Sequence, residues 1–408
     1  MTKDSITGNQ KYDFDKLEGK LCHSCGSDQM SIFHTLNGVP VHSVKNIPLP
    51  EKAIDCPKGN IHLAFCYHCG FISNIAFDPS LLEYSNEYES SQAFSPTFNT
   101  FASDLAARLI DRFNLHDKII LEIGCGNGEF LNLLCEQGGN RGIGFDPAYR
   151  EGRIGIKPNA KITFIKDYYS EKYTNYQADF ICCRMTLEHI QSTANFVSMV
   201  RRSLGARSDA IIFFQVPDVT RILRDCAIED IYFEHCSYFS PGSLARLFRK
   251  CDFNVLRLET DYEGQYLMIE AKTAEYKSFK PLPMENDLNI LADYISSFQE
   301  RYEAKLSSWY KRLQAISSNG KHAVIWGSGS KGVAFLTALG IHDEIKYVVD
   351  INPNRQGTFM PGTGQEIVAP DFLKTYQPET VIVMNPIYLQ EIQQELRHLN
   401  LAPDVLAI

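Results

Sequence analysis

The spacing of apolar and polar positions divides the chain into segments of different character. From Lys118, short apolar runs alternate with helical stretches, beginning KIILEI, EFLNLLCEQ and GIGFD. Such alternation is typical of a mostly parallel sheet that is covered by helices on both faces. We therefore expect an α/β core of the Rossmann-like type over residues 79–277, preceded by a small module of short strands and turns over residues 1–78.

A long amphipathic stretch occupies residues 278–320. Apolar residues recur there at steps of three and four, which predicts one continuous helix that begins after Asn286 or Asp287 and is closed by Asn319–Gly320. The apolar stripe could form a dimer seam, but packing between domains of the same chain is the commoner fate of such stripes. A monomer and a homodimer both stay open.

A second α/β pattern fills residues 321–408. It contains the runs HAVIWGSGSKGVAFLTALG, KYVVDINP and TVIVMNP. We expect a second, smaller Rossmann-like α/β domain at the C-terminal end.

Composition and charge narrow the classes of function. The 408 residues are 44% hydrophobic, which is enough for a core in each of two or three domains. Lys and Arg number 40 against 49 Asp and Glu, the net charge is −9, and no basic block occurs, so nucleic acid is not an expected partner. The N-terminal residues are polar, and no window holds the roughly 18 apolar residues that span a bilayer. We expect a cytoplasmic protein that does not enter a membrane.

Two CxxC turns, each followed by glycine, carry four of the twelve cysteines. They are Cys22 with Cys25, and Cys66 with Cys69. Each turn points two thiolates at one ion, so two turns complete a tetrahedral zinc site. Four thiolates leave no open position for a substrate, which predicts a structural metal. Other potential ligands, ranked lower, are Cys56, His23 and His68.

A glycine-rich turn follows the first strand of the predicted core. Glu122–Gly128 reads EIGCGNG, with glycine at 124, 126 and 128, and Asp146 ends the next strand. Glycines at a strand-to-helix turn let a cofactor approach the backbone closely, and an acid in that place can accept hydrogen bonds from ribose hydroxyls. The GxGxG spacing differs from the dinucleotide pattern and favours a nucleotide-like ligand without a pyrophosphate, such as S-adenosylmethionine.

This turn with its acid resembles the class I S-adenosylmethionine-dependent methyltransferases. Asp167, after the third strand, matches a position that commonly meets the adenine amino group in that family. The stretch ADFICCRMTLEHI also resembles the family's fourth strand and the Leu-Glu-His turn after it. The resemblance implies that Glu122, Gly124, Gly126, Gly128, Asp146 and Asp167 bind the cofactor.

A third signal lies in the loop after the fifth strand, Tyr232–Phe239, which reads YFEHCSYF. Ser240 and Pro241 match the cap and first residue of the next helix. The loop therefore lies at the carboxyl edge of the sheet, where such folds bind ligands. A histidine beside a carboxylate and phenols can act as a general base.

Taken in order along the chain, these features resemble the deoxysugar C-methyltransferases of antibiotic sugar pathways. The likeness covers nearly the whole chain, and it implies a nucleotide-linked keto-sugar as the small-molecule acceptor. His235 would remove the proton beside the ketone, Tyr232 and Glu234 would support it, and the enolate carbon would attack the sulfonium methyl. The segment that joins the first module to the core supplies a further tyrosine, for which Tyr88 is the better match and Tyr84 the second.

The loop departs from that family at Phe233, where many sugar enzymes carry histidine. This change leaves open an alternative function as an O- or C-methyltransferase of another small metabolite.

The C-terminal domain contains Gly327–Gly332, GSGSKG, after a strand, and Asp350 ends the next strand. This is a GxGxxG dinucleotide pattern, so a nicotinamide oxidoreductase is one alternative. The resemblance implies instead that the domain helps to hold the nucleotide-sugar, and Lys331 and the glycine loop could meet its diphosphate. A loop that only supports the fold is an equally good interpretation, and a zinc-dependent interaction module without catalysis is a more distant alternative.

Overall fold

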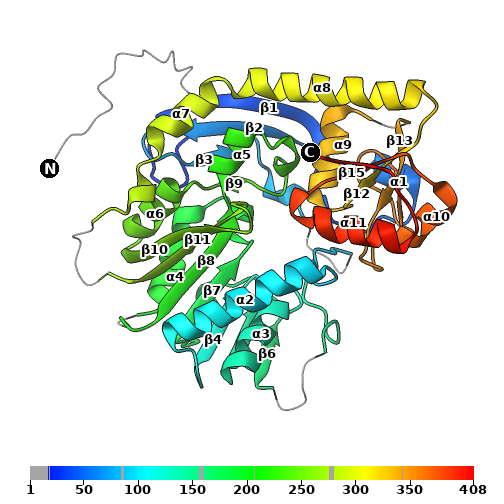
Figure 1. The fold of residues 1–408 in the computed structure, drawn as a ribbon. Helices are drawn as coiled ribbons and strands as arrows, with labels where there is room; N and C mark the ends of the chain where they lie inside the picture. Colours follow the sequence, from blue (N-terminus) through cyan, green and yellow to red (C-terminus); the bar gives the residue numbers. More distant parts are fainter. Residues whose placement is uncertain are drawn as a thin grey trace.

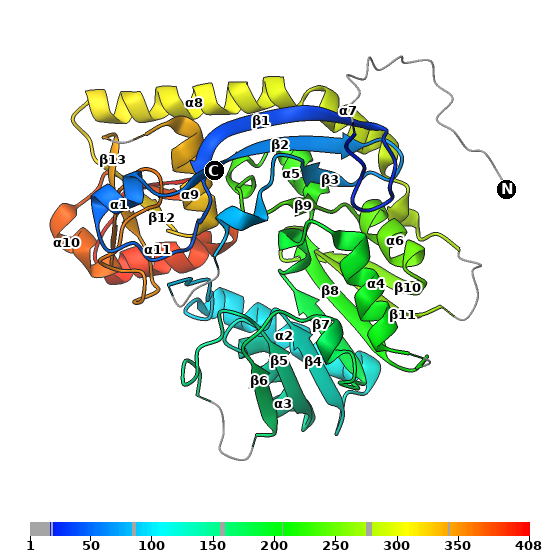
Figure 2. The same ribbon diagram turned by 180° about the vertical axis from the view of Figure 1, so that it is seen from behind.

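The computed structural model describes residues 17, 19–83, 87–155, 160–205, 207–274, 280–341 and 343–408. Three sheets organise these residues, of four, seven and five strands. The N-terminal segment, the core and the C-terminal domain lie around a common centre, with the long helix α8 along one side (Figures 1 and 2).

The seven-stranded sheet forms the core, in the order β10-β11-β8-β7-β4-β5-β6. Six of its strands run in the same direction, and β11 runs antiparallel to its two neighbours, β8 and β10. The strand order reverses between β4 and β7, and ligands bind at such a switch point in open α/β sheets. The predicted α/β fold of the core is therefore confirmed. The core elements are α2 (Pro96–Phe113), β4 (Ile119–Ile123), α3 (Glu129–Gly138), β5 (Arg141–Phe145), β6 (Ile162–Ile165), β7 (Phe180–Arg184), α4 (Thr193–Ser203), β8 (Ile211–Pro217), α5 (Val219–Asp225), α6 (Pro241–Lys250), β10 (Phe253–Asp261) and β11 (Tyr266–Thr273).

The N-terminal sheet takes one of its strands from the core. It consists of β1 (Met30–Pro40), β2 (Lys58–Cys66), β3 (Ile72–Asn74) and β9 (Ser237–Tyr238), with α1 (Pro50–Ile54) between β1 and β2. β9 belongs to the loop after the fifth core strand and pairs antiparallel with β3. Sheet hydrogen bonds thus fix this loop to the first module.

The amphipathic stretch is two helices, so the prediction of one continuous helix is wrong. α7 (Leu288–Ser296) and α8 (Phe298–Ser318) are separated by Ser297. Its backbone leaves the helical range there, with φ −112° and ψ 4°, while its hydroxyl accepts a hydrogen bond from Nε of Arg301 (3.2 Å). The ends agree with the sequence, because Asp287 precedes α7 and Asn319 follows α8.

The apolar stripe of α7 and α8 packs inside the same chain, as expected. Leu291, Phe298, Trp309 and Leu313 are buried in one cluster with residues of β1, β2 and the C-terminal domain. Figure 1 shows α8 lying along β1 and reaching α9. The stripe therefore joins the first module to the last.

The C-terminal sheet is parallel, in the order β14-β13-β12-β15-β16. Its elements are β12 (Ala323–Trp326), α9 (Ser330–Leu339), β13 (Ile345–Val349), β14 (Glu366–Val368), α10 (Leu373–Tyr376), β15 (Thr380–Val383), α11 (Leu389–His398) and β16 (Asp404–Ala407). The second Rossmann-like domain is thus confirmed. Among the helices that the structure describes, none has the length and apolarity needed to cross a bilayer.

Candidate active site and metal centre

The four cysteines of the CxxC turns come together although 40 residues separate the turns. Sγ of Cys22 lies 3.7 Å from Sγ of Cys69, and Sγ of Cys25 lies 3.6 Å from Sγ of Cys66. Thiolates at Zn–S distances of about 2.3 Å in a tetrahedron stand about 3.8 Å apart. The donor set and its spacing are therefore compatible with a zinc site.

Both CxxC turns have the backbone that a thiolate site needs. Gly26 and Gly70 have φ of +83° and +74°, and their amides donate to the carbonyls of Cys22 and Cys66. Cys56, His23 and His68 do not belong to the cluster of possible metal ligands in the described part of the chain. The geometry thus favours the four cysteines over the alternative ligands.

The cofactor loop, Gly124–Gly128, connects β4 to α3 as expected. Gly124 has φ +71°, and a Cβ there would lie 2.0 Å from Oγ1 of Thr186. At Gly126, with φ +58°, a Cβ would have open space, with its nearest atom 3.9 Å away. Gly126 is therefore the glycine of the loop that leaves its backbone open to a ligand.

Asp146 follows β5 and faces this loop. Its carboxylate accepts hydrogen bonds from the amides of Gly126 (2.8 Å) and Ala148 (2.7 Å). Burial raises its pKa, although these two bonds oppose the shift. Glu122, on β4, is 2% exposed, and its Oε2 has no hydrogen-bond partner among the described residues. Burial raises the pKa of Glu122 to about 8. The carboxyl groups of Asp146 and Glu122 together fit a ligand with hydroxyl and amino groups.

Asp167 lies farther out, after β6. Its carboxylate contacts the ammonium group of Lys172 and accepts a hydrogen bond from the hydroxyl of Tyr173 (2.7 Å). These two contacts lower the pKa of Asp167 to about 2. A ligand amino group at this position would have to share or replace the contact with Lys172.

The reaction loop, Tyr232–Tyr238, holds His235 in a buried position. His235 is 4% exposed, and the hydroxyl of Tyr232 is hydrogen-bonded to its Nε2 (2.9 Å). Burial, with a smaller contribution from His189, lowers the pKa of His235 well below its usual value. The imidazole is therefore neutral at pH 7, which is the state that a proton acceptor requires.

Glu234 points away from His235 toward the first module. Its carboxylate accepts hydrogen bonds from the amide (2.9 Å) and the hydroxyl of Ser43, and Tyr88 is hydrogen-bonded to it as well. Burial raises the pKa of Glu234, and these bonds oppose the shift. The structure thus brings Tyr88 to the reaction loop through Glu234, whereas Tyr84 lies outside the described residues.

Phe233 has a structural role in this loop. Its ring is 1% exposed, packs 5.3 Å from the ring of Phe77 between centroids, and would collide with a Cβ on Gly59 at 2.2 Å. It anchors the reaction loop in the apolar core of the N-terminal sheet.

The C-terminal glycine loop, Gly327–Gly332, is bonded to its own domain. Both carboxylate oxygens of Asp350 are engaged, one by the amide and hydroxyl of Ser328 and the other by the amide of Asn352 (2.8 Å). Arg355 is 3% exposed and donates to Oγ (2.6 Å) and O (2.8 Å) of Ser328. These contacts hold the glycine loop to its own domain, and the buried Arg355 in particular supports a structural role for this loop.

Lys331, the predicted diphosphate ligand, contacts the core instead. Its ammonium group forms an ion pair with Asp230, which also pairs with Arg221. Although burial opposes the shift, the two cations lower the pKa of Asp230. Ser330, beside Lys331, is hydrogen-bonded to the hydroxyl of Ser43 (2.8 Å). The C-terminal domain is therefore docked against the first module and against the residues that immediately precede the reaction loop.

Two family models match most of the chain in sequence order. The model for a methyltransferase domain matches residues 98–258, and the model for a C-methyltransferase C-terminal domain matches residues 275–402. The C-methyltransferase NovU of Streptomyces niveus is 26% identical over 301 residues, which are 69% of this chain and 70% of NovU. The chain is an S-adenosylmethionine-dependent methyltransferase. Its resemblance to the C-methyltransferases is confirmed, since both of their domains are matched.

Two solved structures are similar to parts of the methyltransferase. Magnesium protoporphyrin IX methyltransferase from Synechocystis PCC 6803, with bound SAH, is 15% identical with a TM-score of 0.35, and the match covers 44% of this chain and 84% of that one. The 1,6-didemethyltoxoflavin-N1-methyltransferase of Burkholderia thailandensis is 15% identical with a TM-score of 0.33, and the match covers 43% and 79%.

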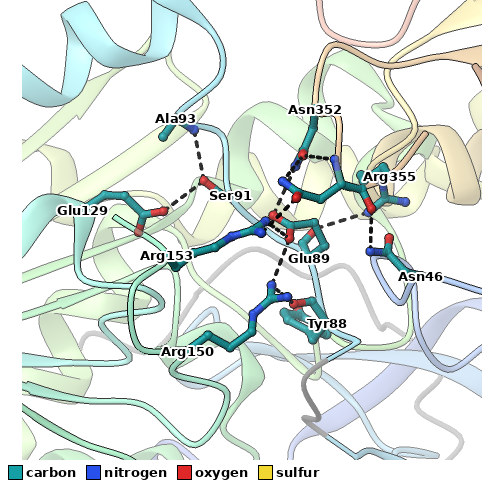
Figure 3. A network of polar contacts seen from close by, with 11 residues as sticks. Asn46, Tyr88, Glu89, Ser91, Ala93, Glu129, Arg150, Arg153, Asn352 and Arg355 are labelled. Atoms are coloured by element: carbon teal, nitrogen blue, oxygen red, sulfur yellow. Dashed lines mark hydrogen bonds and ion pairs between the residues drawn. The ribbon is translucent and has the colours of Figure 1, made fainter. Parts of the chain in front are cut away.

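Glu89 joins three parts of the methyltransferase (Figure 3). Its amide donates to the carbonyl of Val44 in the first module (2.9 Å), and its buried carboxylate contacts the core and the C-terminal domain. Glu89 accepts hydrogen bonds from Arg150 (2.9 Å) and Arg153 of the core and from Asn352 (3.1 Å) of the C-terminal domain. Arg355 donates to the carbonyl of Glu89 (3.2 Å). We call Glu89, Arg150, Arg153, Asn352 and Arg355 the Glu89 cluster. Because Arg150 and Arg153 lie in the segment after Asp146, the cluster connects the cofactor site to the domain interface.

Sequence reasoning missed this cluster and one more acid, Glu188. Glu188 belongs to the Leu-Glu-His turn, Leu187–His189, and lies 4.0 Å from Nε2 of His235. The turn carries a local pattern, but nothing in the sequence shows which side chains face it. The pattern EYESSQ likewise identifies the segment of Glu89 but not its partners.

Proposed function

We propose that the methyltransferase adds a methyl group to the carbon beside the ketone of a nucleotide-linked sugar. The observation that supports this most is the neutral, buried His235 at the carboxyl edge of the core sheet, bonded to a phenol and close to a carboxyl group. A base of this kind suits removal of a proton from carbon.

Each group of the reaction loop has a role in this scheme. His235 accepts the proton from the carbon, and the electron pair of the broken C–H bond passes into an enolate. Tyr232 holds the ring of His235, and Tyr88 and Glu234 orient the loop from the other side. When S-adenosylmethionine is bound, it supplies an electrophilic methyl whose bond to sulfur breaks as the new C–C bond forms. Asp146, Gly126 and Glu122 are the residues that would hold it, with Asp167 at the adenine end.

The surroundings of the base fit a reaction through an oxyanion. Burial raises the pKa of Tyr238 and of Tyr232 above their ordinary values, so both remain neutral donors at pH 7. Donors aimed at a developing negative charge in a buried site lower the barrier strongly. A hydroxyl acceptor, the alternative, would need the base but no such donors.

The proposal is tested in two steps. Calorimetric titration with S-adenosylhomocysteine, alone and with a panel of nucleoside diphosphates, should give binding that one nucleotide strengthens and that Asp146→Asn weakens. Assays would then offer each 4-keto sugar nucleotide and its reduced 4-hydroxy form. A product with a new C–CH₃ group from the keto form alone supports carbon methylation, whereas methylation of the hydroxy form supports the O-methyl alternative.

We also propose that Cys22, Cys25, Cys66 and Cys69 hold a structural zinc ion. The set of four thiolates and the 3.6 and 3.7 Å sulfur separations support it. Cys66→Ser should lower the zinc content below one ion per chain and impair folding, whereas Cys56→Ser should change neither. Full zinc content in Cys66→Ser would contradict the proposal.

A further inference from the structure

Glu188 is a buried acid without a counterion. It is 1% exposed, and neither carboxyl oxygen has a hydrogen-bond partner among the described residues. An ionised carboxylate in such a place would lose its hydration without compensation. Burial accordingly raises the pKa of Glu188 to about 8, so the group is mainly protonated at pH 7 and can donate a hydrogen bond.

The groups that face Glu188 offer it no strong cation. The titratable side chains that face or interact with it within the described residues are Tyr232, His235, His189, Cys236, Cys183 and Tyr266. The basic groups of this set are the imidazoles of His235 and His189, and burial lowers the pKa of both, so both are neutral at pH 7. Nothing in this set holds the carboxyl group in its charged form.

The position of Glu188 is fixed to the reaction loop from two sides. Its carbonyl accepts a hydrogen bond from the amide of Cys236 (3.0 Å), and the side chain of its neighbour His189 is hydrogen-bonded to the backbone of Glu234. Its Oε1 lies 4.0 Å from Nε2 of His235. The acid and the base therefore belong to one rigid unit.

Further buried polar atoms around this unit also lack partners among the residues described. They are Nδ1 of His235, the hydroxyl of Tyr238 and Nε2 of Gln215, which comes from β8. Buried polar atoms are rarely left unpaired in native proteins, and a concentration of them at one sheet edge is typical of a site that a polar ligand completes. The carboxyl group of Glu188 belongs to this set.

We propose that Glu188 donates a hydrogen bond to the acceptor oxygen on which negative charge develops while His235 removes the proton. This deepens the proposed function and rests on it. The carbon–hydrogen bond breaks, the proton moves to His235, and the oxygen gains the charge that the hydrogen bond from Glu188 stabilises. When the new C–C bond forms, the ketone is restored and Glu188 keeps its own proton.

Two variants of Glu188 separate this role from others. Glu188→Gln keeps a neutral N–H donor of similar shape and should retain kcat within about tenfold, whereas Glu188→Leu should lower kcat by about 10²–10³-fold. The KM for S-adenosylmethionine and the affinity for S-adenosylhomocysteine should stay unchanged in both. A loss in Glu188→Gln as large as in Glu188→Leu would overturn the proposal in favour of an ionised carboxylate, and full activity of Glu188→Leu would remove Glu188 from the reaction.

A measurement without acceptor keeps this test independent of the proposed function. The infrared spectrum of the wild type minus that of Glu188→Gln should contain the carbonyl band of a protonated carboxylic acid at pH 7, and the band should disappear as the pH rises through about 8. If the spectrum at pH 7 contains the band of an ionised carboxylate and no carbonyl band, the proposal is overturned. A second bound metal ion lost in Glu188→Gln would also overturn it, because ligand atoms of Glu188, His189 and His235 lie within 4.8 Å of one another. If the band is found but no keto-sugar is methylated, the acceptor assignment fails and the neutral state of Glu188 stands.

Discussion

Glu89 and Glu188 are alike in residue type and in burial, with 1% exposure each, and opposite in their surroundings. Both carboxylate oxygens of Glu89 accept hydrogen bonds. One oxygen accepts from the guanidinium groups of Arg150 and Arg153, and the other accepts from the amide group of Asn352. Neither oxygen of Glu188 has a partner within the described residues. The hydrogen-bond and ion-pair partners of a buried acid, and not its burial, therefore decide its state. With such partners it is a charged contact between domains, and without them it is a neutral donor to a ligand.

This difference has a physical cause. A buried carboxylate stays ionised where cations and hydrogen bonds replace its hydration, and a carboxyl group without them keeps its proton. The Glu89 cluster is therefore a place where a charged carboxylate joins the core to the C-terminal domain. At the Glu188 site, buried polar groups instead lack hydrogen-bond partners among the described residues. Leaving them unpaired lowers the stability of the fold, but it keeps them available to bind a ligand.

The largest effect is expected at the reaction loop, where His235→Asn removes the base. Turnover of the acceptor should fall by about 10²–10⁴-fold, because general base catalysis contributes that much. The affinity for S-adenosylhomocysteine, measured by calorimetry, should stay the same, since His235 is not part of the cofactor loop. Unchanged turnover would exclude His235 as the base.

A large effect on stability is expected at the Glu89 cluster. Glu89→Gln removes the charge that Arg150 and Arg153 surround, and the free energy of unfolding should fall by about 2–4 kcal/mol, below the fully buried case because both arginines are about one-quarter exposed. Urea unfolding at pH 7 measures it. Glu87→Gln, with a side chain 59% exposed in an ion pair with Lys45, is the matched control and should change stability by less than about 1 kcal/mol. Equal effects of the two variants would contradict the interpretation of Glu89 as a charged contact between domains.

The sequence predicted local features of the fold, but not which distant segments contact one another. Ser240 and Pro241 begin α6 as expected, with the Ser240 hydroxyl accepting from the amide of Ser243, because capping is encoded within four residues. Strand and helix alternation likewise gave the core and the C-terminal domain. The pairing of β9 with β3 depends on contacts between residues far apart in the chain, and the apolar spacing of the helical stretch carries no signal for the break at Ser297.

The same limit applies to the candidate site. The four cysteines could be grouped from the sequence because two CxxC turns have a shared chemistry. Glu188 and Glu89 could not be told apart from any other glutamate, since the residues around each of them come from segments far apart in the chain. The predicted contact of Lys331 with a diphosphate remains a prediction, although the structure pairs Lys331 with Asp230.

An effect of similar size to that at Glu89, but of opposite direction, is expected for the stability of Glu188→Gln. The pKa of Glu188 is about 8 in the folded enzyme and about 4.3 in the unfolded chain, so the folded state binds more protons between these values. Stability of the wild type is therefore lost as the pH rises through this window, and the variant lacks this contribution. The stability of the variant relative to the wild type should therefore rise by about 3–4 kcal/mol between pH 5 and pH 8 in urea unfolding. A constant difference between the two proteins over this range would show that Glu188 is ionised throughout.

The smallest effect is expected at the ion pair between the C-terminal glycine loop and the core. Lys331→Met removes one of two cations from Asp230, and Arg221 remains, so the free energy of unfolding should fall by about 1 kcal/mol. If the pair only docks the domain, the affinity for each nucleoside diphosphate in the presence of S-adenosylhomocysteine should be unchanged. A tenfold weaker affinity would mean that Lys331 leaves Asp230 for the diphosphate when the acceptor binds. The glycine loop would then resemble the Glu188 site, whose groups bind a ligand, and not the Glu89 cluster, whose groups hold domains together.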